Sequence, residues 1–380
     1  MYHNRMTDAA AAVTQKLSTD TLRLNAICPY YTMFPLDFPL RHLEESAATR
    51  VLDPFCGRGT TLFAARMAGL PAVGIDINPV AAAIAAAKLT EVQPRSVIRL
   101  ARHILDGGSR GEVPTGDFWD WCFDRTTLNE IVTLRSALLK ISTPTATMLR
   151  ATMLGILHGP RNKGLPSYLS NQMPRTYASK PNYAVKFWKS RNMPPVRINT
   201  LEVLERRLHR LLAATPTAMG GRVYSGDAVT VLKTLRGGFD LVITSPPYYG
   251  MRTYVPDQWL RSWFLGGVPS VPYNTRGQIA RQPNQAAFAK ALADVWSATA
   301  DRCTSGARLV IRFGALPSSR TDPAALVLDS IAKSDADWVV SDVRPAGMSS
   351  KRARQAEQFG KAGSAIEEVD VVAELRRGLW

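Results

Sequence analysis

The chain lacks several features that would place it in other classes of protein. No apolar run reaches the length of a membrane-spanning helix, and the first residues contain no apolar signal-peptide core. The four cysteines (Cys28, Cys56, Cys122 and Cys303) are too scattered for a disulfide framework or a zinc knuckle. The five histidines show no ligand spacing, so no metal site is predicted. These absences indicate a protein of a reducing cytoplasm with no membrane partner.

Acidic residues are scarce relative to basic ones. The 380 residues include 47 Lys and Arg against 31 Asp and Glu, which gives a formal net charge of +16 and a pI near 10. This imbalance predicts a polyanionic partner, and we expect nucleic acid, although the charge taken alone would also fit a membrane surface. The hydrophobic content of 46% is ordinary for a globular protein. A chain of this length can form one large domain with an insertion, or two domains.

Strand and helix patterns alternate in the two outer parts of the chain. Strands are predicted at 50–52, 72–75, 222–224, 239–244, 308–313, 338–343 and 369–375, and helices at 60–68, 80–87 and 285–301. Between about 95 and 221 the alternation stops, and helical patterns at 128–140 and 201–212 flank a proline-rich, irregular stretch. We therefore expect an α/β protein with a doubly wound, mostly parallel sheet and a long, largely helical or irregular insertion.

This alternation divides the chain into three parts. An N-terminal arm and the first half of the sheet domain occupy 1–95, the insertion occupies 96–220, and the second half of the sheet domain occupies 221–380.

A turn with two glycines follows the first predicted strand, in the sequence Asp53-Pro-Phe-Cys-Gly57-Arg-Gly59-Thr-Thr. Glycines at this place let the backbone approach a ligand. Asp76 ends the next strand, 23 residues after Asp53, where a carboxylate can bind both ribose hydroxyls of a nucleoside cofactor. The third glycine of a dinucleotide fold is replaced by Leu62, and no Walker lysine is present. The turn therefore predicts a ligand that has a nucleoside but no phosphate.

A second turn follows the strand at 239–244, in the sequence Ser245-Pro246-Pro247-Tyr248. Two consecutive prolines cannot donate backbone hydrogen bonds, so the strand must end there. Their carbonyl groups can still accept hydrogen bonds, beside a hydroxyl group and an aromatic face. Such a turn is suited to hold a planar ring that carries an amino group.

The two turns together resemble those of S-adenosylmethionine-dependent DNA amino-methyltransferases, which have a Rossmann-like class I methyltransferase fold. The resemblance implies S-adenosylmethionine as the cofactor, with the methionine part on the glycine turn, the ribose on Asp76 and the adenine between Ile77 and Asp227. The segment 29–35, which includes Phe34, resembles the segment that closes over the cofactor, but it could equally be an apolar arm packed on the core. The cofactor residues implied in this way are Phe34, Asp53, Phe55, Cys56, Gly57, Gly59, Thr60, Asp76, Ile77 and Asp227.

The same resemblance implies that the second turn holds the target base. An exocyclic amine is a weak nucleophile because its lone pair is delocalised into the ring. The Ser245 hydroxyl and the Pro246 carbonyl can accept its hydrogens and favour a pyramidal nitrogen, while Tyr248 stacks on a base flipped out of the duplex. Alignment of that nitrogen with the sulfonium methyl supplies much of the remaining rate enhancement. Ser245, Pro246, Pro247 and Tyr248 are the expected catalytic residues.

Ser245 resembles the N4-cytosine type, because enzymes that methylate N6 of adenine usually have Asp or Asn at that position. Many N4-cytosine enzymes, however, carry the two turns in the opposite order along the chain. Adenine N6 methylation and RNA guanine-N2 methylation therefore remain alternatives, as does a non-catalytic nucleic-acid-binding protein with this fold. Attack by a thiolate on the cytosine ring is disfavoured, because neither Cys28 nor Cys56 follows a proline.

No acidic residue occurs from Ile131 to Leu201, whereas basic, aromatic and amide residues recur there. Basic side chains bind phosphates, and arginine and amide side chains can read base edges. We interpret this insertion as the region that recognises double-stranded DNA. The expected contacts are Arg161, Lys163, Arg175, Lys186, Lys189 and Arg191, together with Arg252 after the second turn. A cognate restriction endonuclease is a candidate partner, as expected for a prokaryotic, nucleoid-associated enzyme, and the number of subunits is not determined by the sequence.

Overall fold

The computed structural model describes the residues in nine stretches. They are 19–30, 34–109, 111–161, 164–174, 178–251, 256–272, 279–315, 321–346 and 368–376.

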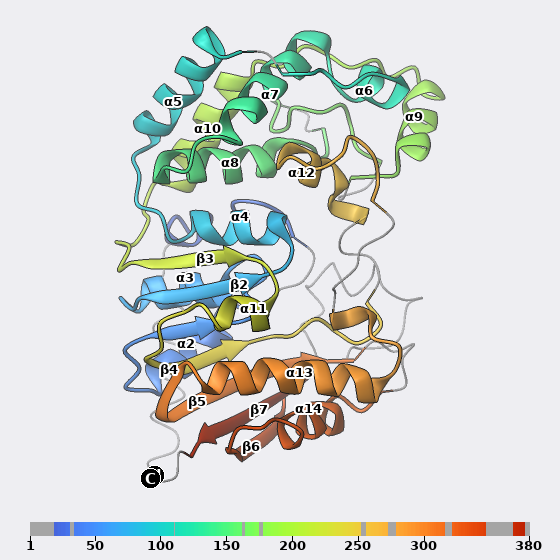
Figure 1. Cartoon of the computed structure of the whole chain (residues 1–380). Helices are drawn as coiled ribbons and strands as arrows, with labels where there is room; N and C mark the ends of the chain where they lie inside the picture. Colours follow the sequence, from blue (N-terminus) through green and yellow to red (C-terminus); the bar gives the residue numbers. More distant parts are fainter. Residues whose placement is uncertain are drawn as a thin grey trace.

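Seven strands form one sheet in the order β3-β2-β1-β4-β5-β7-β6 (Figure 1). The strands are β1 (Val51–Asp53), β2 (Ala72–Asp76), β3 (Gly221–Ser225), β4 (Phe239–Thr244), β5 (Cys303–Gly314), β6 (Trp338–Pro345) and β7 (Glu368–Leu375). Neighbouring strands are parallel except at β7, which is antiparallel to both β5 and β6. The expected mostly parallel sheet is confirmed, and all seven predicted strands lie within it.

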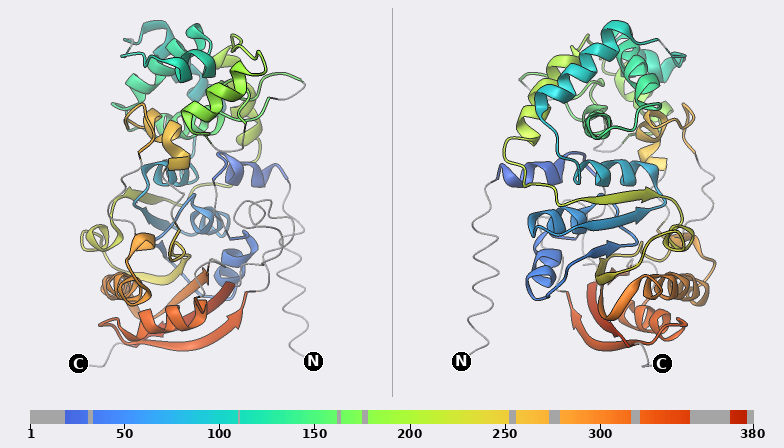
Figure 2. Two further views of the ribbon diagram at one scale, coloured as in Figure 1. Left: turned by 90° about the vertical axis from the view of Figure 1, so that its right-hand side faces the viewer. Right: turned by 60° about the vertical axis from the view of Figure 1, so that its left-hand side comes forward.

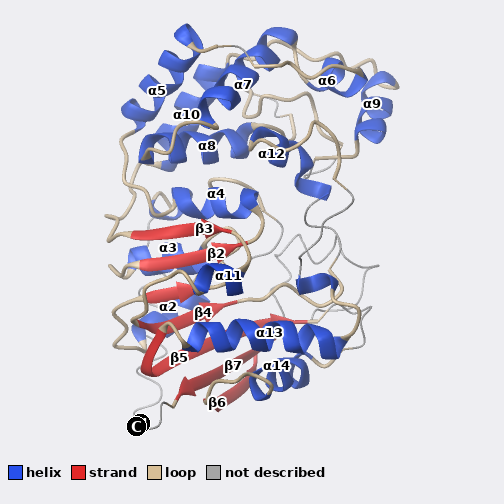
Figure 3. Cartoon of the chain, in the orientation of Figure 1, coloured by secondary structure: helices blue, strands red, loops and turns tan. Residues whose placement is uncertain are grey.

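Helices cover both faces of the sheet, so the sheet is doubly wound (Figure 3). One face packs against α2 (Asp37–Glu44) and α3 (Thr60–Met67). The other packs against α11 (Ala228–Leu232), α13 (Gln285–Ala300) and α14 (Pro323–Ala332). The inner strands are buried on both sides, which explains the apolar run 241–243 within β4.

A layer of helices lies beyond the β3 edge of the sheet (Figures 1 and 2). It consists of α5 (Pro94–Gly107), α6 (Asp117–Cys122), α7 (Arg125–Leu138), α8 (Pro144–Ile156), α9 (Pro181–Lys189), α10 (Thr200–Leu211) and α12 (Trp259–Phe264). The helix α4 (Pro79–Ala87) lies between this layer and the sheet and shares one hydrophobic core with it. The layer is therefore packed continuously onto the sheet domain. No helix in the described stretches is long and apolar enough to cross a membrane.

Three short 3₁₀ helices complete the described elements. They are η1 (Thr21–Ala26), η2 (Pro256–Gln258) and η3 (Ile279–Arg281).

The prediction of an irregular stretch between 140 and 201 is wrong in part, because this stretch contains the helices α8 and α9. Each of these helices has a proline at its first position, Pro144 and Pro181 respectively. Proline is tolerated there because the missing N–H would have no partner inside the helix. The prolines therefore mark helix starts in this segment and are not signs of irregular structure.

Gly155, inside α8, allows this helix to approach the segment that follows η1. A Cβ atom at Gly155 would lie 2.2 Å from the backbone oxygen of Ile27. Ile27 is fully buried in the core that joins α4 to the helical layer. The absence of a side chain is therefore required by packing, against the usual preference of a helix for alanine.

We expect Gly155→Ala to lower the free energy of unfolding by about 1–3 kcal/mol through overpacking, measured by urea denaturation. Gly107→Ala is the matched control, because Gly107 is also helical but a Cβ atom there meets nothing within 4 Å. Equal stability of the two variants would show that α8 does not need this close contact.

Candidate functional site

The two turns lie side by side at the carboxyl edge of the sheet, because β1 and β4 are adjacent and parallel. In the register of this pair Leu52 lies opposite Val242, so both strands end at the same level. The hydroxyl of Thr244 donates a hydrogen bond of 2.7 Å to Oδ1 of Asp53, and both side chains are buried. The structure thus brings together two motifs that are 191 residues apart in the sequence.

Both glycines of the first turn have left-handed backbone conformations, with φ of 50° at Gly57 and 78° at Gly59. A Cβ atom at Gly59 would lie 2.9 Å from Cα of Ala85 in α4, so this residue also permits close packing. A Cβ atom at Gly57 would meet nothing within 4 Å, and its N–H donates 2.9 Å to Oδ2 of Asp76. Gly57 therefore leaves open space at the turn, as a ligand-binding backbone requires.

Two carboxyl groups with raised pKa values lie at this edge. Burial raises the pKa of Asp53 to about 7, although hydrogen bonds from Thr244, Thr61 and the Phe55 N–H oppose the shift. Burial likewise raises the pKa of Asp76 to about 6, against bonds from the N–H groups of Asn78 and Gly57. A site that disfavours its own negative charges in this way suits a cationic ligand.

The remaining residues of the expected cofactor set line the same edge or support it. Ile77 follows Asp76 and is 43% exposed. Phe55 is half-buried and meets Trp296 of α13 edge-on, with ring centroids 6.1 Å apart. Oδ1 of Asp227 accepts hydrogen bonds from the backbone and hydroxyl of Thr230 and so caps α11.

Three further residues of that set are buried. Cys56 and Phe34 belong to the core beneath α2 and α3, and Thr60 is the first residue of α3. Phe34 packs edge-on against Phe38, with ring centroids 5.2 Å apart. These side chains therefore contribute to the core that underlies the glycine turn.

The N-terminal arm reaches the same edge through Tyr30. Its hydroxyl accepts a hydrogen bond of 3.0 Å from Nδ2 of Asn78, and the ring is 8% exposed. Asn78 also caps α4. Residues 31–33 of the arm lie outside the described residues. Tyr30 and Phe34 thus lie on the core near the turn, which fits both interpretations of the arm.

Four basic side chains, three of them buried and Arg207 half-buried, hold the arm in place. They bind oxygens of Asn25, Ala26, Ile27 and Pro29, and the four are Arg58 of the glycine turn, Lys88 after α4, Arg207 of α10 and Arg261 of α12. None of the four forms an ion pair within the described stretches. The arm is therefore anchored at once to the glycine turn and to the helical layer.

The second turn leaves polar groups available. Within the described part of the chain, the Ser245 hydroxyl, which is half-buried, makes no hydrogen bond, and no N–H binds the carbonyl of the buried Pro246. Pro247 is half-buried, and the Tyr248 hydroxyl donates 2.6 Å to Oε1 of Glu368. The arrangement can therefore present two acceptors and an aromatic ring to one ligand group.

The expected DNA contacts are only partly within the described residues. Arg161, Lys186, Lys189 and Arg191 are exposed, whereas Lys163, Arg175 and Arg252 lie outside the described residues. Two other basic residues of the insertion have structural roles. Arg135 donates to the carbonyl of Trp263, and Arg150 donates to the carbonyls of Leu138 and Ile141.

An open groove of about 690 Å³ lies between α6, α9 and α12. Its wall on α9 carries Asn182, Lys186 and Lys189, and its opposite side includes Asp117, which pairs with Lys189 at 2.6 Å. In Figure 1 these three helices lie on the side toward which the arrowheads of β2 and β3 point. The groove therefore lies on the side of the molecule where the two turns lie.

Sequence reasoning missed several residues that organise the site. Asn78 gave a signal, since Asn before Pro is typical of a helix start. Arg58 also gave a signal, because it lies between the two glycines of the turn. Glu368 gave no signal, because its partner Tyr248 is 120 residues away.

A protein-family model described as DNA methylase matches residues 12–87. The match covers β1, the glycine turn and Asp76, and it confirms the resemblance to DNA amino-methyltransferases. It supports methyl transfer to a nucleic acid, without distinguishing N4 of cytosine from N6 of adenine. No curated protein matches the chain.

Solved structures resemble the chain only distantly. The rRNA methyltransferase aviRa from Streptomyces viridochromogenes is 15% identical, with a TM-score of 0.33 and coverage of 94% of this chain and 93% of that one. An rRNA methylase from Streptococcus thermophilus is 8% identical, with a TM-score of 0.33 and coverage of 91% and 99%. A geranyl diphosphate methyltransferase in complex with GPP and sinefungin is 10% identical, with a TM-score of 0.34 and coverage of 98% and 99%. Values this low say nothing about the substrate of this chain.

The raised pKa of Asp53 should make stability depend on pH. Because its pKa is about 7 in the folded chain against an ordinary 3.8, the folded state binds this proton more tightly than the unfolded state. The contribution is complete below pH 3.8 and is lost as the pH rises to about 7. Over that range Asp53→Asn should gain stability relative to the parent by roughly 4 kcal/mol at most, measured by urea denaturation.

Asp76 titrates in both proteins, so the difference between the two curves reports Asp53 together with its repulsion by Asp76. Parallel curves across this range would mean that Asp53 is ionised at little cost in the folded chain.

Proposed function

We propose that this chain transfers the methyl group of S-adenosylmethionine to the exocyclic N4 amine of cytosine in duplex DNA, at a specific short site, after flipping the base. One observation carries the proposal: the hydrogen bond of 2.7 Å between Thr244 and Asp53 joins the ends of the two strands that bear the turns. A donor on one turn and a base on the other would therefore meet at one edge. The match of residues 12–87 to DNA methylases supports the same conclusion.

The first turn fits the proposed cofactor. The open space at Gly57 suits its methionine part, and the paired carboxyl groups of Asp53 and Asp76 favour its positive charges. Asp76 still has acceptor capacity for ribose hydroxyls, since each of its oxygens accepts one backbone bond. The exposed Ile77 supplies an apolar surface for adenine, with Asp227 on the neighbouring strand end. When bound, S-adenosylmethionine supplies an electrophilic methyl group.

The second turn would activate the base. The hydroxyl of Ser245 and the carbonyl of Pro246 accept the two hydrogens of the amine and draw its lone pair out of conjugation. Pro247 keeps the chain from folding back into the sheet, and Tyr248 offers its ring for stacking. No strong base is needed at the start, because the nitrogen becomes acidic only as the new bond forms.

The helical layer would bind the DNA around the flipped base, so the division at 95 and 220 would separate methyl transfer from target recognition. The α9 wall of the groove presents two lysines and an amide to solvent. The net charge of +16 favours a polyanion on such a surface.

The decisive experiment incubates the protein with tritiated S-adenosylmethionine and, separately, unmethylated phage DNA and tRNA, followed by nucleoside analysis. Label in N4-methylcytosine supports the proposal, and label in N6-methyladenine changes the base assignment. Label found only in RNA, or none at all, would overturn it.

Ser245→Ala should lower turnover on DNA at least tenfold while leaving calorimetric affinity for S-adenosylmethionine unchanged, because one amine acceptor is lost. Ser262→Ala, a change of the same kind in α12, is the control. A Ser245→Ala enzyme as fast as the control would remove Ser245 from the mechanism.

Exchange of both Lys186 and Lys189 for alanine should weaken DNA binding and make it less dependent on salt. Each phosphate contact contributes about 0.9 to the slope of log K against log salt concentration, so the slope should fall by roughly 2. Fluorescence anisotropy with a labelled duplex measures this slope. Lys333→Ala, at the residue after α14, is the control. A slope equal to that of the control would show that this wall of the groove does not contact DNA.

A further inference from the structure

The ring of Tyr248 is held at three points where β5 and β7 meet. Its hydroxyl donates 2.6 Å to Oε1 of Glu368, the first residue of β7. Its ring meets Phe313 edge-on, with centroids 5.7 Å apart. A Cβ atom at Gly314 would lie 2.8 Å from Cζ of Tyr248, so the ring occupies the space above a glycine. The orientation of Tyr248 is therefore determined by groups outside its own turn.

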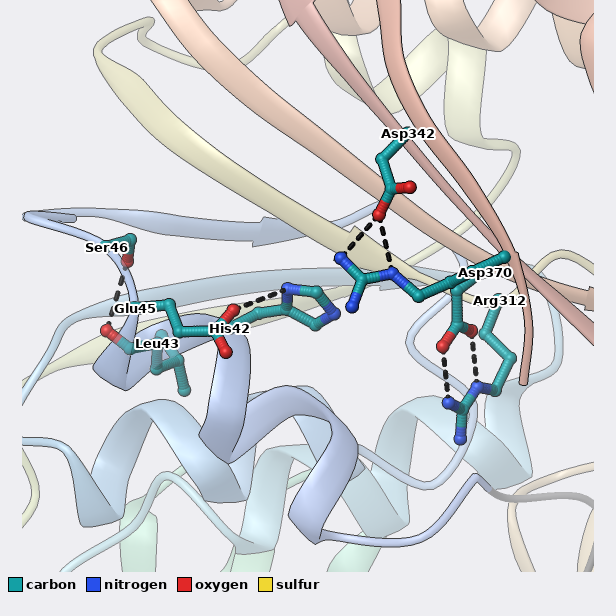
Figure 4. A network of polar contacts seen from close by, with 8 residues as sticks. His42, Leu43, Glu45, Ser46, Arg312, Asp342 and Asp370 are labelled. Atoms are coloured by element: carbon teal, nitrogen blue, oxygen red, sulfur yellow. Dashed lines mark hydrogen bonds and ion pairs between the residues drawn. The ribbon is translucent and has the colours of Figure 1, made fainter. Parts of the chain in front are cut away.

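The carboxylate that holds Tyr248 is itself part of a rigid ladder. Glu368 lies directly opposite Gly314 across the antiparallel pair of β5 and β7, and Asp370 lies opposite Arg312. Arg312 and Asp370 form a buried ion pair with two bonds of 2.7 Å (Figure 4). Residues two apart on a strand share a face, so this ion pair fixes the strand end beside Glu368.

A stacking platform is effective only if its plane is set before the ligand arrives. A tyrosine on a loop after two prolines would otherwise lose side-chain freedom on binding, which weakens affinity. Aromatic stacking also depends on the offset and tilt of the two rings. A charge-assisted bond at the far end of the phenol removes this freedom in advance.

We infer that Glu368 is a positioning residue for base recognition: by accepting the Tyr248 hydroxyl it sets the plane on which the flipped base stacks. This inference rests on the proposed function, since Tyr248 has a base to receive only if the chain acts on one. It adds a residue from β7, the last strand along the chain, to a site otherwise built at the ends of β1, β2, β3 and β4.

The test is a double-mutant cycle with Glu368→Ala, Tyr248→Phe and both together. On unmethylated phage DNA, each single variant should lose about tenfold in kcat/KM, mainly through KM for DNA, and the double variant should lose no more. Calorimetric affinity for S-adenosylmethionine should not change in any of them. Glu368→Gln keeps an acceptor oxygen and should recover most of the loss.

Two further variants separate positioning from general damage. Glu374→Ala changes an exposed residue at the other end of β7 and should behave as the parent does. Gly314→Ala retains Glu368, but a Cβ atom there would lie 2.8 Å from Cζ of Tyr248 and 3.1 Å from Cγ of Glu368. It should therefore displace the ring together with its partner and reproduce the loss of Glu368→Ala.

The outcomes distinguish the two proposals. A parent protein that methylates no DNA overturns the proposed function. An active parent with Glu368→Ala equal to Glu374→Ala, or with additive losses in the double variant, overturns only the role of Glu368.

Discussion

The arrangement of this molecule depends on one buried hydrogen bond, from the hydroxyl of Thr244 to the carboxyl group of Asp53. It joins the ends of β1 and β4, the central parallel pair of the sheet, where two turns of unlike chemistry begin. Asp53 is 1% exposed, and its pKa is raised because burial destabilises the ionised carboxylate. That cost is offset only partly by hydrogen bonds, which is typical of a site prepared for a ligand. Every role assigned to the glycine turn or to Ser-Pro-Pro-Tyr presupposes this junction.

Two sets of contacts extend the junction into the rest of the protein. Basic side chains from the glycine turn, the residue after α4, α10 and α12 converge on the segment 25–29, so the arm next to the turn is fixed by the helical layer. On the other side, β7 supports Tyr248 through Glu368. A buried basic group without an acidic partner is costly. Arg58, Lys88 and Arg261 form no ion pair in the part of the chain that the structure describes, and backbone and amide oxygens bind them instead. The turns are thereby supported by the helical layer beyond β3 on one side and by β7 on the other.

The distribution of charge separates a region suited to a cationic cofactor from a region suited to DNA. At the carboxyl edge Asp53 is buried and Asp76 is half-buried, and both favour a cation, whereas the exposed face of α9 is basic and favours a polyanion. A cationic methyl donor and a DNA duplex would thus be attracted to different parts of one surface. The groove between α6, α9 and α12 lies on the side of the molecule where the turns lie.

The sequence by itself determined the fold class and the two turns. Local signals suffice for these: apolar strands buried on both faces, glycines in left-handed turns, and Asp76 at a fixed distance from Asp53. The helices α3, α7, α10 and α13 were predicted within a few residues for the same reason. The helices α8 and α9 were missed because their prolines were read as breaks, although proline suits a first helical position equally well.

Only the tertiary structure decided which distant groups meet. Tyr248 pairs with Glu368, and Asp53 is buried against Thr244, across long separations in the chain. The four basic side chains that bind the segment 25–29 likewise come from elements far apart in the sequence. The groove likewise needs α6, α9 and α12 together, and α12 follows the second turn while the other two precede β3. The burial of a side chain and its hydrogen-bond partners depend on how distant elements pack. Local residue patterns therefore do not predict them.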